Sequence, residues 1–170
     1  MKSAAVQKYY RKLHMSLILL AIIGIFLSAY ALYVEVLKEI DRDYQAMCDI
    51  SASISCSKVF TSKYGRGFGI LGELLGEDHL LNQPNSIFGM IFYCLVIIMG
   101  EIKSLKVAKF QRVFIGLSNL MSIYLAYLLY FVLKDFCIVC VSTYIVNILL
   151  TVLAFMRVPV LQKMTKLKVI

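Results

Sequence analysis

The five cysteines are the residues with the clearest capacity for chemistry. Cys137 and Cys140 stand three apart in Cys137-Ile-Val-Cys140, and on a helix this spacing lets two sulfurs approach closely enough for a disulfide. Cys48 and Cys56 are separated by seven residues and form a second pair. Two dithiol pairs in one chain indicate thiol–disulfide exchange. Cys94 has no such neighbour, and we expect it to pack within a helix.

Two other interpretations of these cysteines are open. A metal site is disfavoured, because the chain has only two histidines and the spacing from Cys48 to Cys56 does not match a zinc knuckle. A Cys-x-x-Cys motif in an apolar helix can also be two small packing residues. Its expected place in the first turn of a helix favours redox chemistry, since the helix dipole there stabilises a thiolate.

The elements that position these cysteines are apolar and helix-sized. Hydrophobic residues make up 61% of the 170 residues, with a mean hydropathy of +0.80, which excludes a water-soluble globule covered by charge. Four apolar stretches have about the length that crosses a hydrocarbon core as a helix. The sequence therefore predicts an all-α integral membrane protein, a bundle of four transmembrane helices forming one membrane domain over 1–170. The expected helices are about 13–36, 85–101, 111–133 and 136–157, with a lumenal loop or cap over 38–84.

Charge predicts the orientation of this bundle. Segments 1–12, 101–112 and 157–170 carry twelve basic residues and one acid, Glu101, whereas 38–83 carries five basic and seven acidic residues. This is the positive-inside pattern, so we expect both termini in the cytoplasm and the long loop in the lumen. The net charge of +8 is then a signal of topology, and we expect no nucleic-acid partner.

Polar residues are expected to converge near the Cys-x-x-Cys motif. Cys140, Tyr144 and Asn147 follow a helical stripe that includes Cys137 and should face the bundle interior. The Tyr144 phenol can donate a hydrogen bond to a ligand bound beside Cys140, although Tyr144 and Asn147 can also bond between helices. Asn85 is the matching donor at the start of the second helix, or else an N-cap of that helix.

The long loop contains two features of its own. The glycines of the segment 65–69 permit backbone conformations closed to other residues, so we expect this segment to fold back on the bundle or dip into the membrane interface. Residues 70–79 are compatible with a short amphipathic helix beside the mouth of the bundle.

These motifs resemble the vitamin K epoxide reductase family over nearly the whole chain. The matching runs, in order, are Cys48, Ile54-Ser-Cys56-Ser-Lys-Val-Phe60, Tyr64-Gly-Arg-Gly-Phe-Gly69, Asn82-Gln-Pro-Asn85-Ser-Ile-Phe-Gly89, and Phe136-Cys-Ile-Val-Cys140 followed by Thr143-Tyr144. One departure is Tyr64, where many vertebrate members carry Trp; both are amphipathic aromatics suited to the interface.

The resemblance implies a role for each site residue. Cys137 and Cys140 are the redox centre, with Cys140 engaging the substrate, and Cys48 and Cys56 are the shuttle pair, with Cys56 exchanging onto Cys137. The implied substrate-binding residues are two polar donors, two ring-stacking aromatics and two leucines of the apolar wall: Asn85, Tyr144, Phe60, Phe88, Leu125 and Leu129.

The resemblance also implies partners and a location. Vitamin K epoxide or quinone is the expected substrate, no cofactor is tightly bound, and a thioredoxin-like lumenal oxidoreductase supplies electrons. The lipid bilayer is a further expected partner, and inhibitors of the 4-hydroxycoumarin type are expected ligands. The tail Lys166-Leu-Lys168-Val-Ile170 is similar to a dilysine signal, which agrees with the endoplasmic reticulum membrane. Two alternatives are open: a quinone-dependent enzyme that generates disulfides for secretory proteins, and a non-enzymatic membrane scaffold.

Overall fold

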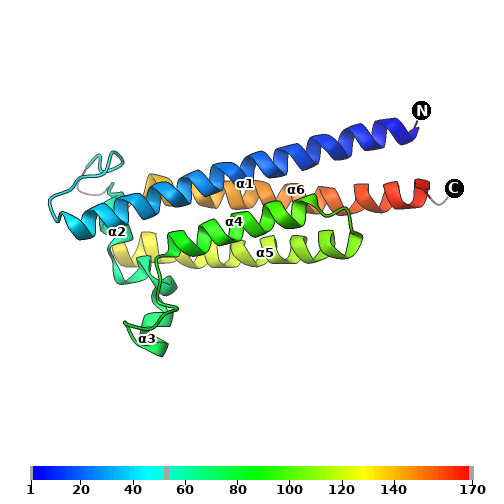
Figure 1. Ribbon diagram of the computed structural model, residues 1–170. Helices are drawn as coiled ribbons and strands as arrows, with labels where there is room; N and C mark the ends of the chain where they lie inside the picture. The colour runs from blue at the N-terminus through cyan, green and yellow to red at the C-terminus, as the bar shows by residue number, and fades with distance from the viewer. Residues whose placement is uncertain (1, 52–53, 169–170) are drawn as a thin grey trace.

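Four long helices lie side by side and make up most of the molecule (Figure 1). The computed structural model describes residues 2–51 and 54–168, so Val169 and Ile170 of the expected dilysine signal lie outside the described residues. The helices are α1 (Lys2–Ile40), α4 (Asn85–Glu101), α5 (Leu105–Tyr127), which continues as a π-helix over Leu128–Leu133, and α6 (Ile138–Lys168). The described residues contain isolated β-bridges but no strand, so the all-α prediction is confirmed.

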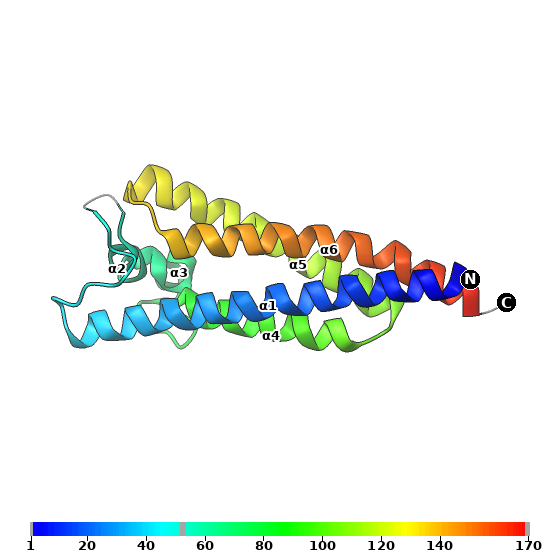
Figure 2. The same cartoon turned by 90° about the horizontal axis from the view of Figure 1, so that it is seen from above.

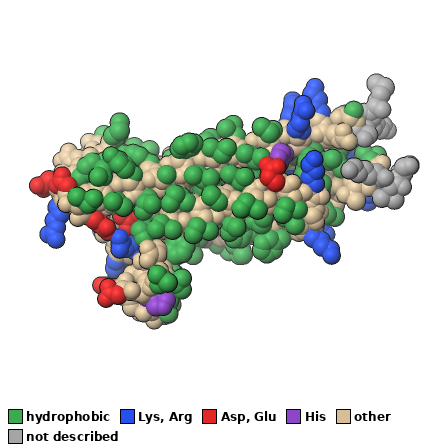
Figure 3. Space-filling view, viewed as in Figure 1, with side chains coloured by type: hydrophobic (Ala, Val, Ile, Leu, Met, Phe, Trp, Pro, Cys, Tyr) green, Lys and Arg blue, Asp and Glu red, His purple; other side chains and the backbone are tan. Residues whose placement is uncertain are grey.

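Three of the helical segments have the length and hydropathy of membrane spans. They cover Ala4–Ile40, Leu105–Leu133 and Ile138–Leu167, while α4 is apolar but has only 17 residues. Apolar side chains cover the middle of the molecule in Figure 3, and Lys and Arg gather at the end where α1 begins and α6 ends. Large apolar residues of the long helices, such as Phe26 in α1 and Ile123 in α5, are exposed. Such a surface is suited to lipid and fits a membrane protein.

The helices extend past the apolar stretches that predict them. The first was expected over about 13–36 and runs over Lys2–Ile40, and the last was expected over about 136–157 and runs over Ile138–Lys168. Hydropathy marks the part of a helix that suits lipid, whereas backbone hydrogen bonding continues through polar residues with good helix propensity.

Close packing of α1 against α4 depends on small residues. Gly24 of α1 faces Tyr93 of α4, and a Cβ atom at Gly24 would lie 2.4 Å from the tyrosine ring. Gly89 of α4 faces Ser28 of α1 in the same way. Small residues let helix backbones approach closely where no hydrophobic effect drives them together. Figure 2 shows α1 running alongside both α4 and α6.

Arg157 closes the end of the bundle at which α1 begins. Its side chain is 1% exposed, and the guanidinium donates to Gln111 Oε1, to the Tyr10 hydroxyl at 3.2 Å and to three backbone carbonyls. Those carbonyls belong to Met99, Gly100 and Ile102. The last carbonyls of a helix have no intrahelical partner, so Arg157 of α6 caps α4.

The loop at the opposite end contacts the bundle through the segment 65–69, which takes the first of its two expected placements. It contains α2 (Cys56–Phe60), short 3₁₀ turns at Lys63–Gly65 and Gly67–Gly69, and α3 (Leu71–Leu75). Positive φ angles of 51° at Gly67 and 70° at Gly69 turn the chain. The Gly67 amide then donates to the Gln83 carbonyl at 2.9 Å. Arg66 between these turns pairs with Glu35 and Glu39 of α1.

Two local expectations are corrected. The helix expected over 70–79 ends at Leu75, because Gly76 takes a φ of 100°, which a helix cannot continue. Cys94 was expected to pack and is instead exposed on the outside of α4. Most of α4 is apolar on every side, so hydropathy alone does not distinguish its inward face.

Candidate active site

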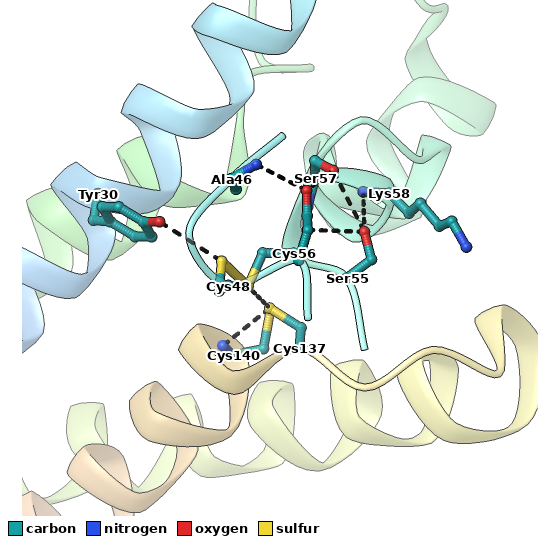
Figure 4. The surroundings of a disulfide bond; sticks show 10 residues. Tyr30, Ala46, Cys48, Ser55, Cys56, Ser57, Lys58, Cys137 and Cys140 are labelled. Carbon is teal, nitrogen blue, oxygen red and sulfur yellow. Dashed lines mark hydrogen bonds between the residues drawn. A yellow bond between two sulfur atoms is a disulfide. The ribbon is translucent and has the colours of Figure 1, made fainter. Parts of the chain in front are cut away.

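Both cysteine pairs meet where the loop contacts the start of α6 (Figure 4). Cys48 and Cys56 form a disulfide, and the Cys137 sulfur lies 3.6 Å from the Cys56 sulfur. Cys56 and Cys137 are completely buried, while Cys140 is partly exposed. The four cysteines therefore follow one another from the loop into the bundle. Cys48 is bonded to Cys56, Cys56 contacts Cys137, and the Cys137 sulfur contacts the backbone of Cys140.

Backbone contacts bring Cys56 over Cys137. The Ser55 amide donates to the Phe136 carbonyl at 3.1 Å, and Ile54 forms a parallel bridge with Phe136. Ser55 is also the N-cap of α2, because its side chain accepts from the Lys58 amide. Cys56 is thus the first residue of a capped helix. Ser55 and Phe136, which directly precede Cys56 and Cys137, are hydrogen-bonded to each other, and this bond brings the two cysteines together.

Asp49 organises the loop between Cys48 and Cys56. Its carboxylate accepts the Ala46 amide at 2.9 Å, the Ser55 hydroxyl at 2.9 Å, and both the amide and the hydroxyl of Ser57. Burial acts to raise the pKa of Asp49, but the hydrogen bonds, led by those from Ser57, outweigh it and lower the pKa to about 2. The ionised carboxylate therefore holds the two cysteines in a compact turn.

Cys137 directly precedes α6, where backbone amides are available. The Cys140 amide donates to the Cys137 sulfur at 3.3 Å, and the Val141 amide donates to the Cys137 carbonyl. The first amides of a helix have no intrahelical acceptor and carry the positive end of the dipole. This arrangement stabilises a thiolate on Cys137.

A cavity of about 440 Å³ opens beside Cys140 inside the bundle. Seven of the ten expected site residues line it: Cys140, Asn85, Tyr144, Phe60, Phe88, Leu125 and Leu129. The other three, Cys48, Cys56 and Cys137, lie outside the lining and form the sulfur contacts described above. The structure therefore separates the expected residues into a pocket and a path of cysteines, with Cys140 on the border between them.

Asn85 connects this cavity to the loop. Its side-chain amide donates to the Tyr64 carbonyl at 2.7 Å, and its Oδ1 accepts the Phe68 amide at 2.8 Å. The alternative role as an N-cap is wrong, because Pro84 occupies the N-cap position of α4. Asn85 lines the cavity, and one of its two amide hydrogens has no acceptor among the described residues.

Tyr144 and Asn147 differ although they share one stripe. Asn147 accepts from the Tyr93 hydroxyl at 2.9 Å and donates to Ser122 at 3.0 Å, so the interhelical alternative is confirmed for Asn147. The Tyr144 hydroxyl has no hydrogen-bond partner among the described residues, and the same holds for the buried Ser86 hydroxyl. Both residues line the cavity and can donate to a ligand.

Several lining residues were missed from the sequence. Phe68 packs on Phe88 with ring centroids 5.1 Å apart, and Tyr93 and Glu35 also line the cavity. An acid directly after the first apolar stretch was a usable signal for Glu35. Phe68 gave none, because its place depends on the turn at Gly67.

Comparison with known proteins identifies the family. A profile of the Vitamin K epoxide reductase family matches residues 15–155. The chain is 45% identical to the mouse (Mus musculus) protein named vitamin K epoxide reductase complex subunit 1, over 144 residues that cover 82% of this chain and 87% of that protein. It is 44% identical to the rat (Rattus norvegicus) protein of the same name, with the same coverage. The chain belongs to the vitamin K epoxide reductase family and is an oxidoreductase of that family.

Proposed function

We propose that the protein reduces vitamin K epoxide and vitamin K quinone within the membrane, using electrons relayed through its two cysteine pairs. One observation carries the proposal: Cys56 contacts Cys137, and Cys140, the other cysteine of the Cys-x-x-Cys motif, lies in the wall of an apolar cavity. A quinone ring fits such a cavity, and a sulfur at its wall can react with that ring.

The chemistry at the cavity begins on reduced Cys137 and Cys140. The Cys140 thiolate attacks the epoxide or quinone ring, and Cys137 then attacks the Cys140 sulfur and releases the reduced product. Two thiols become one disulfide; the epoxide yields quinone and water, and the quinone yields hydroquinone. Membership of the family and the position of Cys140 in the cavity wall support this order.

The shuttle pair restores the thiols. Reduced Cys56 attacks the Cys137 sulfur and releases Cys140, and Cys48 then attacks Cys56 and releases Cys137. A lumenal protein of the thioredoxin type reduces the resulting Cys48–Cys56 disulfide. The 3.6 Å contact between Cys56 and Cys137 supports this exchange, since it needs no large movement of either sulfur.

The lining of the cavity supports a binding mode for the naphthoquinone head group. Asn85 and Tyr144 donate to its two polar ends, and Phe60 and Phe88 pack on its ring. Leu125 and Leu129 form the apolar wall. All six residues lie on one cavity, and inhibitors of the 4-hydroxycoumarin type would use the same donors.

We further propose a location and an orientation. The chain spans the membrane of the endoplasmic reticulum four times, with both termini in the cytoplasm and the loop over 38–84 forming a lumenal cap. Helices α1 and α6 carry the basic ends of the chain on one end of the bundle, which supports this orientation. Glycosylation acceptors engineered near residue 76 should be modified in microsomes, and acceptors appended beyond residue 170 should not. The reverse pattern contradicts the orientation.

Turnover of the purified protein tests the function. Dithiothreitol serves as reductant, and vitamin K epoxide is compared with vitamin K quinone. We expect reduction of both. Reduction of quinone without epoxide would favour the alternative of a quinone-dependent enzyme that generates disulfides. Turnover of neither, in folded protein, contradicts the proposal and favours the scaffold.

A further inference from the structure

Tyr30 provides a hydrogen-bond donor to the outer sulfur of the shuttle pair. Its hydroxyl lies 3.8 Å from the Cys48 sulfur, within the distance of a hydrogen bond to sulfur (Figure 4). Cys48 in the disulfide carries no hydrogen, so Tyr30 must be the donor. Cys48 is 9% exposed, and Tyr30 reaches it from α1, a helix that contributes no cysteine.

Charge develops on that sulfur whenever the two cysteine pairs exchange. When the Cys137 thiolate attacks Cys56, the bond between Cys56 and Cys48 breaks, a bond between Cys56 and Cys137 forms, and Cys48 leaves with the electron pair as a thiolate. In the reverse direction Cys48 must attack as a thiolate. A buried thiolate is costly without a hydrogen-bond donor, because burial removes the water that would otherwise solvate it.

We propose that Tyr30 is a catalytic residue of the exchange between the two cysteine pairs, donating a hydrogen bond that stabilises the Cys48 thiolate. The role rests on the proposed relay and adds a residue to it. No external oxidant is needed, because electrons only move between sulfurs. The same hydrogen bond acts in both directions, since the Cys48 thiolate occurs in each.

Other ionisable groups near the shuttle pair do not replace Tyr30. Tyr44 packs against the buried core that contains Cys48 and Cys56, and Tyr33 lies close to Tyr44, but neither tyrosine makes a hydrogen bond to Cys48 among the described residues. Asp49 is an anion engaged by the loop and cannot donate. Cys137 contacts Cys56, on the other side of the disulfide.

Two reductants isolate the exchange step. Dithiothreitol is small and can reduce the Cys137–Cys140 disulfide directly, whereas reduced thioredoxin, used as the protein probe, must act through the shuttle pair. Turnover of vitamin K epoxide is measured with each for the full-length protein, Tyr30→Phe, and the control Tyr44→Phe. Losing a hydrogen bond to a charged group typically costs about tenfold or more. We expect Tyr30→Phe to lower the ratio of thioredoxin-driven to dithiothreitol-driven turnover by about that factor, and Tyr44→Phe to keep the ratio of the wild type.

A second measurement reports on the thiolate itself. In a Cys56→Ser background Cys48 has lost its disulfide partner, so under oxidising conditions Cys137 and Cys140 pair with each other and Cys48 stays free. Alkylation of Cys48 by iodoacetamide is then followed as a function of pH, because only the thiolate reacts. Adding Tyr30→Phe should shift this profile to higher pH, and adding Tyr44→Phe should not.

The outcomes separate this inference from the relay. If Tyr30→Phe matches Tyr44→Phe in both measurements while Cys48→Ala loses thioredoxin-driven turnover, the relay stands and the role of Tyr30 is wrong. If Tyr30→Phe lowers turnover equally with both reductants and leaves the alkylation profile unchanged, its role is structural and the inference is overturned. If Cys48→Ala keeps thioredoxin-driven turnover, the relay fails and the role of Tyr30 fails with it.

Discussion

The two ends of the helix bundle both bury polar groups, but they satisfy them differently. At the basic end, where α1 begins and α6 ends, the two terminal nitrogens of Arg157 reach five acceptors, three of them carbonyls at the end of α4, while its Nε has no partner among the described residues. At the cysteine end, where the loop meets the start of α6, the hydroxyls of Tyr144 and Ser86 border a cavity, and neither has a partner in the described part of the chain.

This contrast shows how a small membrane protein combines rigidity with reactivity. A buried donor that lacks a partner costs free energy, typically about 1–3 kcal/mol, and a donor that is bonded contributes stability. The basic end contributes stability by fixing four helices to one another through Arg157. The cysteine end retains donors and a sulfur that can change partners. The following experiments break each end separately.

The largest effect is expected at the proposed redox centre. Cys137→Ala and Cys140→Ala should each abolish turnover with every reductant, because no disulfide can then form beside the cavity. Cys48→Ala should abolish turnover driven by a protein reductant while retaining part of that driven by dithiothreitol. Vitamin K epoxide consumption measures all three. Full activity of Cys137→Ala with either reductant would contradict the relay.

Removal of the guanidinium should break the basic end. Arg157→Met leaves the carbonyls of α4 and the Gln111 side chain without their donor, and we expect a loss of about 3 kcal/mol in the free energy of unfolding. Denaturant unfolding in detergent measures this loss. Lys109→Met, which removes an exposed charge from α5, is the matched control and should change stability little. Equal stability of the two variants would show that Arg157 is not a structural cap.

The polar donors of the cavity should affect binding more than stability. In the proposed binding mode Tyr144→Phe and Asn85→Ala would each remove a hydrogen bond to the ligand, which corresponds to roughly 5- to 150-fold weaker substrate binding. Asn85→Ala should also loosen the loop, because its amide holds Tyr64 and Phe68. Tryptic cleavage after Arg66 should therefore be faster in Asn85→Ala than in Tyr144→Phe. Wild-type binding by both folded variants would contradict the proposed pocket.

The smallest effect is expected from acid at the shuttle loop. The folded pKa of Asp49, about 2, lies below its ordinary value of 3.8, so its carboxylate stabilises the loop above about pH 4. This stabilisation is lost as pH falls toward 2. Reduction of the Cys48–Cys56 disulfide by a phosphine should accelerate over that range, relative to oxidised glutathione as a reference. Asp49→Asn should remove this dependence; an identical pH profile in the variant would show that Asp49 does not hold the loop.

Local patterns in the sequence predict the helices better than they predict the contacts. Hydropathy identifies the apolar part of each long helix, but the continuation of α1 to Lys2 depends on backbone bonding that hydropathy does not report. Arg157 was interpreted only as a positive charge favouring the cytoplasm, and its burial against Tyr10, 147 positions away, has no local signal. The contact of Cys56 with Cys137, 81 positions apart, was reached only through the family resemblance.

The capping of α4 by Arg157 has a consequence for the order in which the chain assembles. Synthesis proceeds from the N-terminus, so the Gly100 carbonyl is made 57 residues before the guanidinium that binds it. During that interval the end of α4 must keep its carbonyls in contact with water, because lipid offers them no donor. The basic end of the bundle therefore closes only when α6 is in place. The end of α4 thus acquires its tertiary contacts only after the last helix of the chain has been made.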